Sequence, residues 1–238
     1  MNYVCKKHSV VALVIVLILV GVLSADVRLP SIISDNMVLQ QGKAVPIWGW
    51  ADANEAVTVT GSWGSGKWET TADANGKWMV KIDSGKEGGP YEMTVAGKNP
   101  VTVKNILVGE VWVCSGQSNM EFTVRQANNS AQEIADANNY PQIRSFNVGR
   151  KVIYTPMYNC NGKWQVCSAQ TAGNFTAAGY FFGRELTKQL NVPVGLIHTS
   201  WGGTPAESWM SREYLENDPN FQPILKRFEE VSGGEAEI

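Results

Sequence analysis

Apolar and polar residues alternate in short runs through the part of the chain that follows residue 25. These runs span residues 44–50, 56–60, 67–71, 77–82 and 91–95. Alternation with a period of two is typical of strands that bury one face, and turn residues separate the runs. Asn75-Gly76 favours a hairpin between two of them, because both residues tolerate the positive φ of a two-residue turn. The pattern predicts an all-β sandwich over residues 26–104.

The same region holds five tryptophans, which raises the question of a sugar-binding surface. They are Trp48, Trp50, Trp63, Trp68 and Trp78. Large aromatic side chains in small sandwiches mostly fill the core. We therefore expect these side chains to pack in the core rather than to stack on sugar rings.

The pattern changes at Asn105, where the apolar runs become nearly continuous. Two such runs lie within residues 106–114 and fit strands buried on both faces. Residues 174–190 carry apolar side chains near helical spacing, and residues 194–198 fit another buried strand. This order of elements predicts an α/β domain over residues 105–238.

The N-terminus carries the pattern of a secretory signal peptide. Lys6 and Lys7 precede an uncharged apolar run over residues 10–23, and Ser24 and Ala25 supply small residues at a cleavage point. A retained membrane anchor is the alternative, but a run of about fourteen residues reaches only about 21 Å, short of a hydrocarbon core of about 30 Å. We therefore expect residues 1–25 to be removed, leaving no integral membrane segment. The mature chain is then periplasmic or extracellular, or secreted or lysosomal in a eukaryote.

Composition narrows the class of protein. The 238 residues include 20 Lys and Arg against 22 Asp and Glu, a net charge of -2, and 44% are hydrophobic. Disordered chains have fewer apolar residues, and nucleic-acid binders usually show a basic excess. We therefore expect a globular protein with no nucleic-acid partner.

Cysteine and histidine are scarce after residue 25. Cys114, Cys160, Cys167 and His198 remain, which is too few ligands at paired spacings for a zinc site. We expect no metal and no other cofactor. Cys160 and Cys167 flank a loop and suit a local disulfide in an oxidising compartment, whereas Cys114 lies in an apolar run and is expected to be a buried free thiol.

Small-residue turns follow two of the predicted buried strands. One spans residues 115–121 and contains Ser118, and the other spans residues 199–207 and contains a glycine pair. In an open parallel sheet the carboxyl ends of the strands are where ligands bind. A serine there can be a nucleophile with backbone N–H groups around its oxyanion, or it can simply cap a helix. The Gly-x-Ser-x-Gly elbow is excluded, because Met120 stands at the second glycine position.

Both turns carry longer motifs. Residues 108–121 read VGEVWVCSGQSNME, and residues 195–207 read GLIHTSWGGTPAE. These segments resemble the sialate O-acetylesterase family of SGNH-type hydrolases. The resemblance extends to RLP at residues 28–30, DNMVLQ at 35–40 and GPY at 89–91, which are similar to the family's N-terminal β domain.

The resemblance implies a flavodoxin-like parallel sheet and an activity. Ser118 would be the nucleophile of an esterase that hydrolyses O-acetyl groups of sialic acid or a related acetylated glycan through an acyl-serine intermediate. Gly203 or Gly202 would donate an oxyanion N–H, and Gly203 is preferred because Gly202 is needed for the turn itself. Weaker substrate-binding roles fall on Gln117, Asn119 and Thr204.

The chain departs from the family after the second motif. Members continue with a Gln-Gly-Glu block and later with an Asp and a His that complete the triad, and neither block appears after Gly203. His198 could serve as the base, but it ends a buried strand and belongs to a different motif. We expect a C-terminally truncated, incomplete SGNH-type domain. The alternative is a catalytically inactive fragment that binds glycan or is purely structural.

Overall fold

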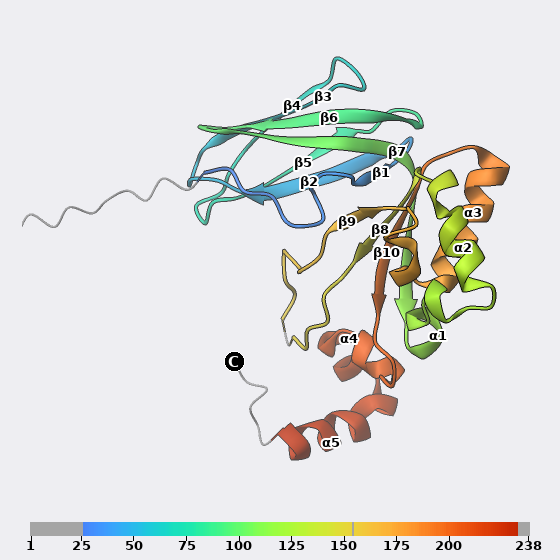
Figure 1. The fold of residues 1–238 in the computed structure, drawn as a ribbon. Helices are drawn as coiled ribbons and strands as arrows, with labels where there is room; N and C mark the ends of the chain where they lie inside the picture. The colour runs from blue at the N-terminus through green and yellow to red at the C-terminus, as the bar shows by residue number, and fades with distance from the viewer. Residues whose placement is uncertain (1–25, 154, 233–238) are drawn as a thin grey trace, which may run out of the picture.

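The computed structural model describes residues 26–153 and 155–232 (Figure 1). The predicted signal peptide lies outside this range. The strands are β1 (Val38–Gln40), β2 (Ala44–Trp50), β3 (Ala56–Gly61), β4 (Lys67–Thr71), β5 (Lys77–Asp83), β6 (Gly88–Ala96), β7 (Pro100–Gly116), β8 (Ile143–Asn147), β9 (Trp164–Val166) and β10 (Val194–Ser200). The α-helices are α1 (Ser118–Glu121), α2 (Ser130–Asp136), α3 (Ala177–Leu190), α4 (Arg212–Asn217) and α5 (Gln222–Ser232).

One large mixed sheet organises the chain. Its strand order is β4-β3-β6-β7-β10-β8-β9, with β1 also paired to β7, while β2 and β5 form a second, two-stranded sheet. The two sheets share one hydrophobic core, since Ile47 and Ile82 from the small sheet lie in the same cluster as Val59 and Met93 from the large one. The fold is therefore mixed α/β.

Strand β7 joins the two regions that the sequence pattern separates. Its first half pairs antiparallel with β6 up to Val108, and its second half pairs parallel with β10 from Glu110 onward. The boundary expected between residues 104 and 105 falls inside this strand, where Asn105 has a positive φ of 55°. A separate all-β sandwich is therefore not confirmed, although the expected strands do form.

The hairpin predicted at Asn75-Gly76 is wrong. The turn itself forms: Gly76 has a φ of 75° and its N–H donates to the carbonyl of Asp73 at 2.9 Å. However, β4 pairs with β3, and β5 pairs with β2. The turn passes the chain from one sheet to the other, because β4 and β5 each find a better partner elsewhere.

The parallel part of the sheet is built from β7, β10 and β8. Their pairings are parallel, and β9 adds an antiparallel edge to β8. Helix α3 packs on β10 and β8, and α2 lies beside it on the same side (Figure 1). On the opposite face, Phe146 of β8 and Trp164 of β9 join the core of the N-terminal strands.

The cysteines differ from the expected pairing. Cys114, Cys160 and Cys167 are all free thiols, so the local disulfide is absent. Cys167 is buried in the core under α3, whereas Cys160 packs against the other core cluster. The short strand β9 separates the two residues and directs them to different cores. The expectation that Cys114 is buried is confirmed, with 5% of its surface exposed.

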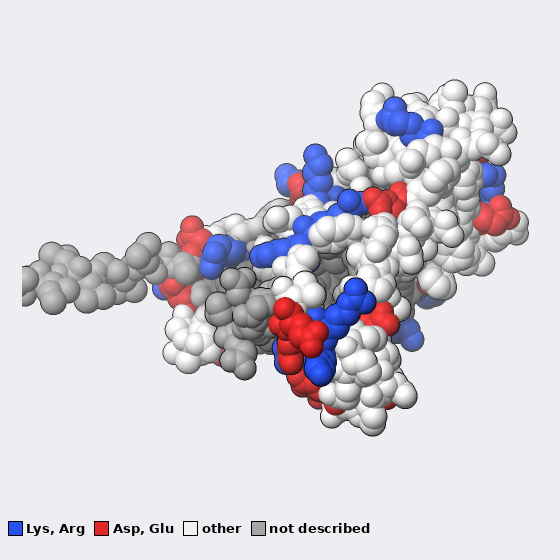
Figure 2. All heavy atoms as spheres, turned by 90° about the horizontal axis from the view of Figure 1, so that it is seen from below, with Lys and Arg blue, Asp and Glu red and all other residues white. Residues whose placement is uncertain are grey.

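Charged side chains are spread thinly over the face of the molecule seen from below (Figure 2). The view in Figure 2 shows small groups of Lys and Arg next to Asp and Glu, separated by broad uncharged areas. Within residues 26–153 and 155–232, every helix is too short or too polar to span a bilayer.

Candidate active site

Ser118 stands where β7 gives way to α1. The strand ends at Gly116, which has a φ of 146°, and Ser118 is the first residue of the helix. The N-cap position belongs to Gln117, so the Ser118 hydroxyl does not cap the helix. Ser118 is exposed, and its hydroxyl makes no hydrogen bond to any described residue. This side chain is open to a ligand.

The glycine turn lies beside Ser118. The parallel pairing sets His198 opposite Cys114 and Ser200 opposite Gly116, so β7 and β10 end level with each other. The Trp201 N–H donates to the Gly116 carbonyl at 3.0 Å. A Cβ placed on Gly202 would lie 3.7 Å from the Cα of Ser118. The register of two neighbouring strands thus brings together the two motifs, which are about eighty residues apart.

The two glycines differ in what their N–H groups do. The Gly202 N–H donates to Oε2 of Glu121. Gly203 has a φ of 82° and is exposed, and open space surrounds the position that a Cβ would take. Its N–H has no acceptor within the described part of the chain, so it is the glycine donor of this turn that remains free for a ligand.

Glu121 holds the glycine turn in place through its carboxylate. Its second carboxylate oxygen is paired with Arg150, whose guanidinium carbon also lies 5.6 Å from the ring centre of Trp201. The hydrogen bond from Gly202 holds the pKa of Glu121 below its ordinary value, and Arg150 lowers this pKa further against the opposing effect of burial. Glu121 is therefore held as a carboxylate that fixes the loop.

His198 is engaged by its neighbours rather than by Ser118. Nε2 lies 2.6 Å from Oγ of Ser200, and Nδ1 lies 3.3 Å from Oδ1 of Asn147. Burial lowers the pKa of His198, although the Met120 backbone and the Glu121 charge act in the opposite direction. With both ring nitrogens occupied, His198 is a neutral structural residue in this arrangement.

The predicted sugar contacts are placed differently from one another. Gln117 and Asn119 are exposed on either side of Ser118. The Thr204 hydroxyl instead donates to the Trp201 carbonyl at 2.7 Å and accepts from the Trp209 indole N–H at 2.8 Å. It closes the glycine loop. The substrate-binding roles of these three residues stay predictions.

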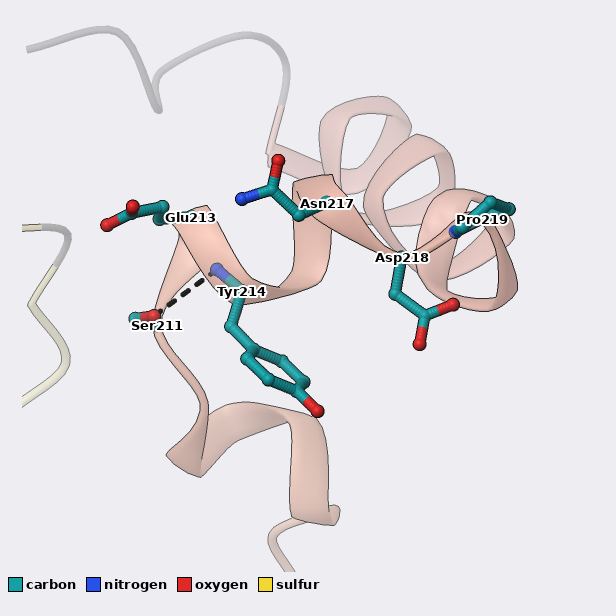
Figure 3. A pocket seen from close by; sticks show the side chains of 6 residues that line it. All are labelled: Ser211, Glu213, Tyr214, Asn217, Asp218 and Pro219. Atoms are coloured by element: carbon teal, nitrogen blue, oxygen red, sulfur yellow. Dashed lines mark hydrogen bonds between the residues drawn. The ribbon is translucent and has the colours of Figure 1, made fainter.

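A surface cavity is formed by residues that follow the glycine turn in the sequence, but it is separate from the candidate active site. A cavity of about 480 Å³ is lined by Ser211, Glu213, Tyr214, Asn217, Asp218 and Pro219 (Figure 3). The Ser211 hydroxyl caps α4 by accepting from the Tyr214 N–H at 3.3 Å. None of the predicted site residues lines this cavity. Among the residues with described positions, no group of three His, Cys, Asp or Glu side chains could hold a metal ion.

Sequence reasoning missed Arg150 as part of this site. It follows β8, which is parallel to β10 and ends at the same edge of the sheet. The sequence feature that could have indicated it is the short mixed run at residues 143–147 followed by Gly149. This segment can be recognised as a third strand end only once β8 is identified.

Comparison with known proteins covers this whole site. Residues 108–237 match the model of the carbohydrate esterase family described as sialic acid-specific acetylesterase. Sialate O-acetylesterase of Rattus norvegicus is 36% identical over 207 residues, or 79% of this chain and 38% of the relative. The Homo sapiens enzyme of that name is 35% identical over 227 residues, or 87% of this chain and 43% of the relative.

A solved structure agrees with the sequence relatives. A carbohydrate acetylesterase from Xanthomonas citri superposes with a TM-score of 0.77 at 36% identity, covering 82% of this chain and 45% of that one. The chain thus spans about two fifths of the length of the curated relatives that it matches. On the match over residues 108–237, the chain belongs to the sialic acid-specific acetylesterase family of carbohydrate esterases.

Proposed function

We propose that this chain forms the nucleophile-bearing part of an exported carbohydrate O-acetylesterase. The substrate is an O-acetylated sialic acid or a related acetylated glycan. The observation that carries the proposal is the exposed, unengaged hydroxyl of Ser118 beside the glycine turn in which the Gly203 N–H is free, within a segment that matches the acetylesterase family. Curated relatives that share this segment are named sialate O-acetylesterases.

The reaction proceeds by acyl transfer to Ser118. Its Oγ bonds to the acetyl carbonyl carbon while the hydroxyl proton passes to a base. The carbonyl electron pair moves onto oxygen, where the Gly203 N–H stabilises the developing negative charge. When the carbonyl re-forms, the bond to the sugar oxygen breaks and that oxygen takes up a proton. Water then attacks the acetyl-serine in the same way and releases acetate.

The base is the component that the described residues do not supply. His198 is the sole histidine after residue 25, and both of its ring nitrogens already have partners. We propose that the Asp and His implied by the family resemblance provide the base from a longer form of the protein. Glu121 and Arg150 act as positioning residues, because they hold the Gly202 N–H and so orient the next peptide.

The test is acetate release from an acetylated aryl ester and from O-acetylated sialic acid. It compares the 238-residue chain with a form extended to the length of the relatives. In the extended form, Ser118→Ala should lower the rate by about a thousandfold or more. Ser115→Ala is the matched control, since Ser115 is also exposed and lies at the end of β7, just before α1. Retained activity in Ser118→Ala would rule out the acyl-serine route.

A second candidate function is favoured by the engaged state of His198. Because no described residue offers a free imidazole near Ser118, the 238-residue chain by itself would bind acetylated sugar without hydrolysing it, or would be structural. Binding of O-acetylated sialic acid with no acetate release would support this candidate. Turnover by the short chain that is abolished in His198→Ala would contradict it and would make His198 the base.

A further inference from the structure

A second hollow lies on the β2–β5 sheet, in the strand-rich half of the molecule and away from α1 (Figure 1). Its volume is about 320 Å³. The lining comes from the outer face of β2 and β5, from β4 and the turn after it, and from the loop that carries Tyr158. No residue of the esterase motifs contributes to it.

The floor of this hollow is aromatic. Trp48 and Trp50 alternate with the buried Ile47 and Gly49 along β2, so both indoles face outward and are half-buried. The Trp48 indole N–H donates to the Tyr158 carbonyl at 3.0 Å, which ties the loop to the sheet. Flat aromatic faces with limited freedom are suited to pack against the C–H face of a pyranose ring. The expectation that the tryptophans are core residues therefore fails for Trp50, whereas Trp48 is half-buried and packs against the edge of the core cluster.

Two cations lie around Trp50, of which Lys77 lines the hollow and Arg28 lies just outside it. Lys77 is directly opposite Trp50 in the β2–β5 pairing, and its Nζ lies 4.1 Å from the Tyr158 ring centre. Arg28 pairs with Trp50 from the other side, with its guanidinium carbon 5.9 Å from the indole. Asp73 also lines the hollow, and its Oδ1 accepts from the Asn75 and Lys77 N–H groups. Two cations thus flank Trp50, while the carboxylate is engaged in its turn.

The charged groups around the hollow determine which ligands of an aromatic surface would bind here. A quaternary ammonium group would normally suit an aromatic site, but here Lys77 already occupies the face of Tyr158 and would repel a second cation. Thr70 and Thr71 add hydroxyl groups to the lining. A ring with hydroxyl groups and a carboxylate fits the combination of indoles, threonines and cations.

We propose that this hollow binds an acidic pyranose sugar, with its ring against Trp48 and Trp50 and its carboxylate beside Lys77. The site is distinct from the turn that carries Ser118. It would hold a terminal acidic residue of a glycan independently of ester hydrolysis.

The experiment is calorimetric titration of the chain with 3′-sialyllactose, using lactose as the neutral probe. Neither probe carries an acetyl ester, so the result does not depend on esterase activity. We expect sialyllactose to bind more tightly than lactose, with the preference shrinking as salt rises. Trp50→Ala should weaken binding about tenfold, whereas Trp63→Ala should not, because Trp63 is a half-buried tryptophan outside the hollow.

Two conservative lysine variants distinguish a specific loss of binding from a loss caused by misfolding. Lys77→Gln should reduce the preference for sialyllactose over lactose to near one. Lys81→Gln on the same strand should preserve it, since Lys81 is also exposed but does not line the hollow. Equal binding of the two probes, or equal losses in Lys77→Gln and Lys81→Gln, would overturn the proposal. If sialyllactose binding disappears in Ser118→Ala and survives in Trp50→Ala, the sugar site is the esterase turn and not this hollow.

Discussion

Gly109 of β7 lies against the backbone of Pro193, just before β10, and replacing it with alanine tests how the active-site turns are held together. Gly109 is buried, and a Cβ at this position would lie 2.1 Å from the carbonyl oxygen of Pro193. Ordinary contact begins at 3.4 Å, so the two backbones must separate by about 3.4 − 2.1 = 1.3 Å. The hydrogen bond from the Glu110 N–H to the same oxygen is 2.9 Å long and would break.

The cost of this substitution can be worked from its parts. Overpacking a buried site costs about 1–3 kcal/mol, and loss of one buried backbone hydrogen bond adds about 1 kcal/mol. Replacement of glycine also reduces the entropy of the unfolded chain, which returns about 0.5 kcal/mol. We expect the free energy of unfolding to fall by about 1.5–3.5 kcal/mol, or about 3–14 °C in Tm for a chain of this size.

Thermal unfolding of Gly109→Ala beside Gly64→Ala measures this difference. Gly64 is exposed in the loop between β3 and β4 and has nothing within 4 Å of a Cβ, so its variant should melt within about 2 °C of the unmodified chain. In the form extended to the length of the relatives, which would supply the base, reaction of Ser118 with a fluorophosphonate should slow in Gly109→Ala, because a displacement of about 1 Å can cost about a hundredfold. Equal melting of the two variants would refute the reasoning.

Three further predictions concern other parts of the molecule. Burial lowers the pKa of His198 below 6.5 in the folded chain. The free energy of unfolding should therefore fall as the pH drops through about 6.5 and become constant below the folded pKa. Thermal melts of His198→Asn should lack this pH dependence. Burial raises the pKa of Cys167 to about 12, so iodoacetamide at pH 8, followed by peptide mass spectrometry, should modify the half-buried Cys160 at least about tenfold faster. In urea unfolding, Phe146→Ala should cost about 3–5 kcal/mol because Phe146 is fully buried, against less than about 1.5 kcal/mol for the 41% exposed Phe182.

The elements that sequence patterns predicted best are those with strong local signals. The alternating runs became β2 to β6, with β2 and β4 exact and no end displaced by more than three residues, and the helical spacing after Asn174 became α3, which begins at Ala177. Thr176 explains that start, because its hydroxyl accepts from the Gly179 N–H as an N-cap. Strands β1, β8 and β9 are short and lie among mixed residues, so periodicity could not identify them.

Pairing between distant segments was harder to predict than the elements themselves. The turn at Asn75-Gly76 has the local chemistry of a hairpin, yet the partner of each flanking strand is set by the shared core. In the candidate site, sequence patterns identified both turns. They could not reveal that the Gly202 N–H donates to Glu121 while the Gly203 N–H stays free. This difference between the two glycine N–H groups depends on side-chain contacts across the sheet rather than on the local sequence pattern.

The long strand β7 has a consequence for synthesis. Its second half pairs with β10, and the first pairing joins residues 110 and 194, which are 84 positions apart. At about 5–20 residues per second, the ribosome would present this half-strand for about 4–17 s before its partner emerges. Trp112 and Val113 remain 44% and 65% exposed even in the folded chain. Until β10 emerges, this stretch therefore exposes apolar surface on which a nascent chain can self-associate or a chaperone can bind.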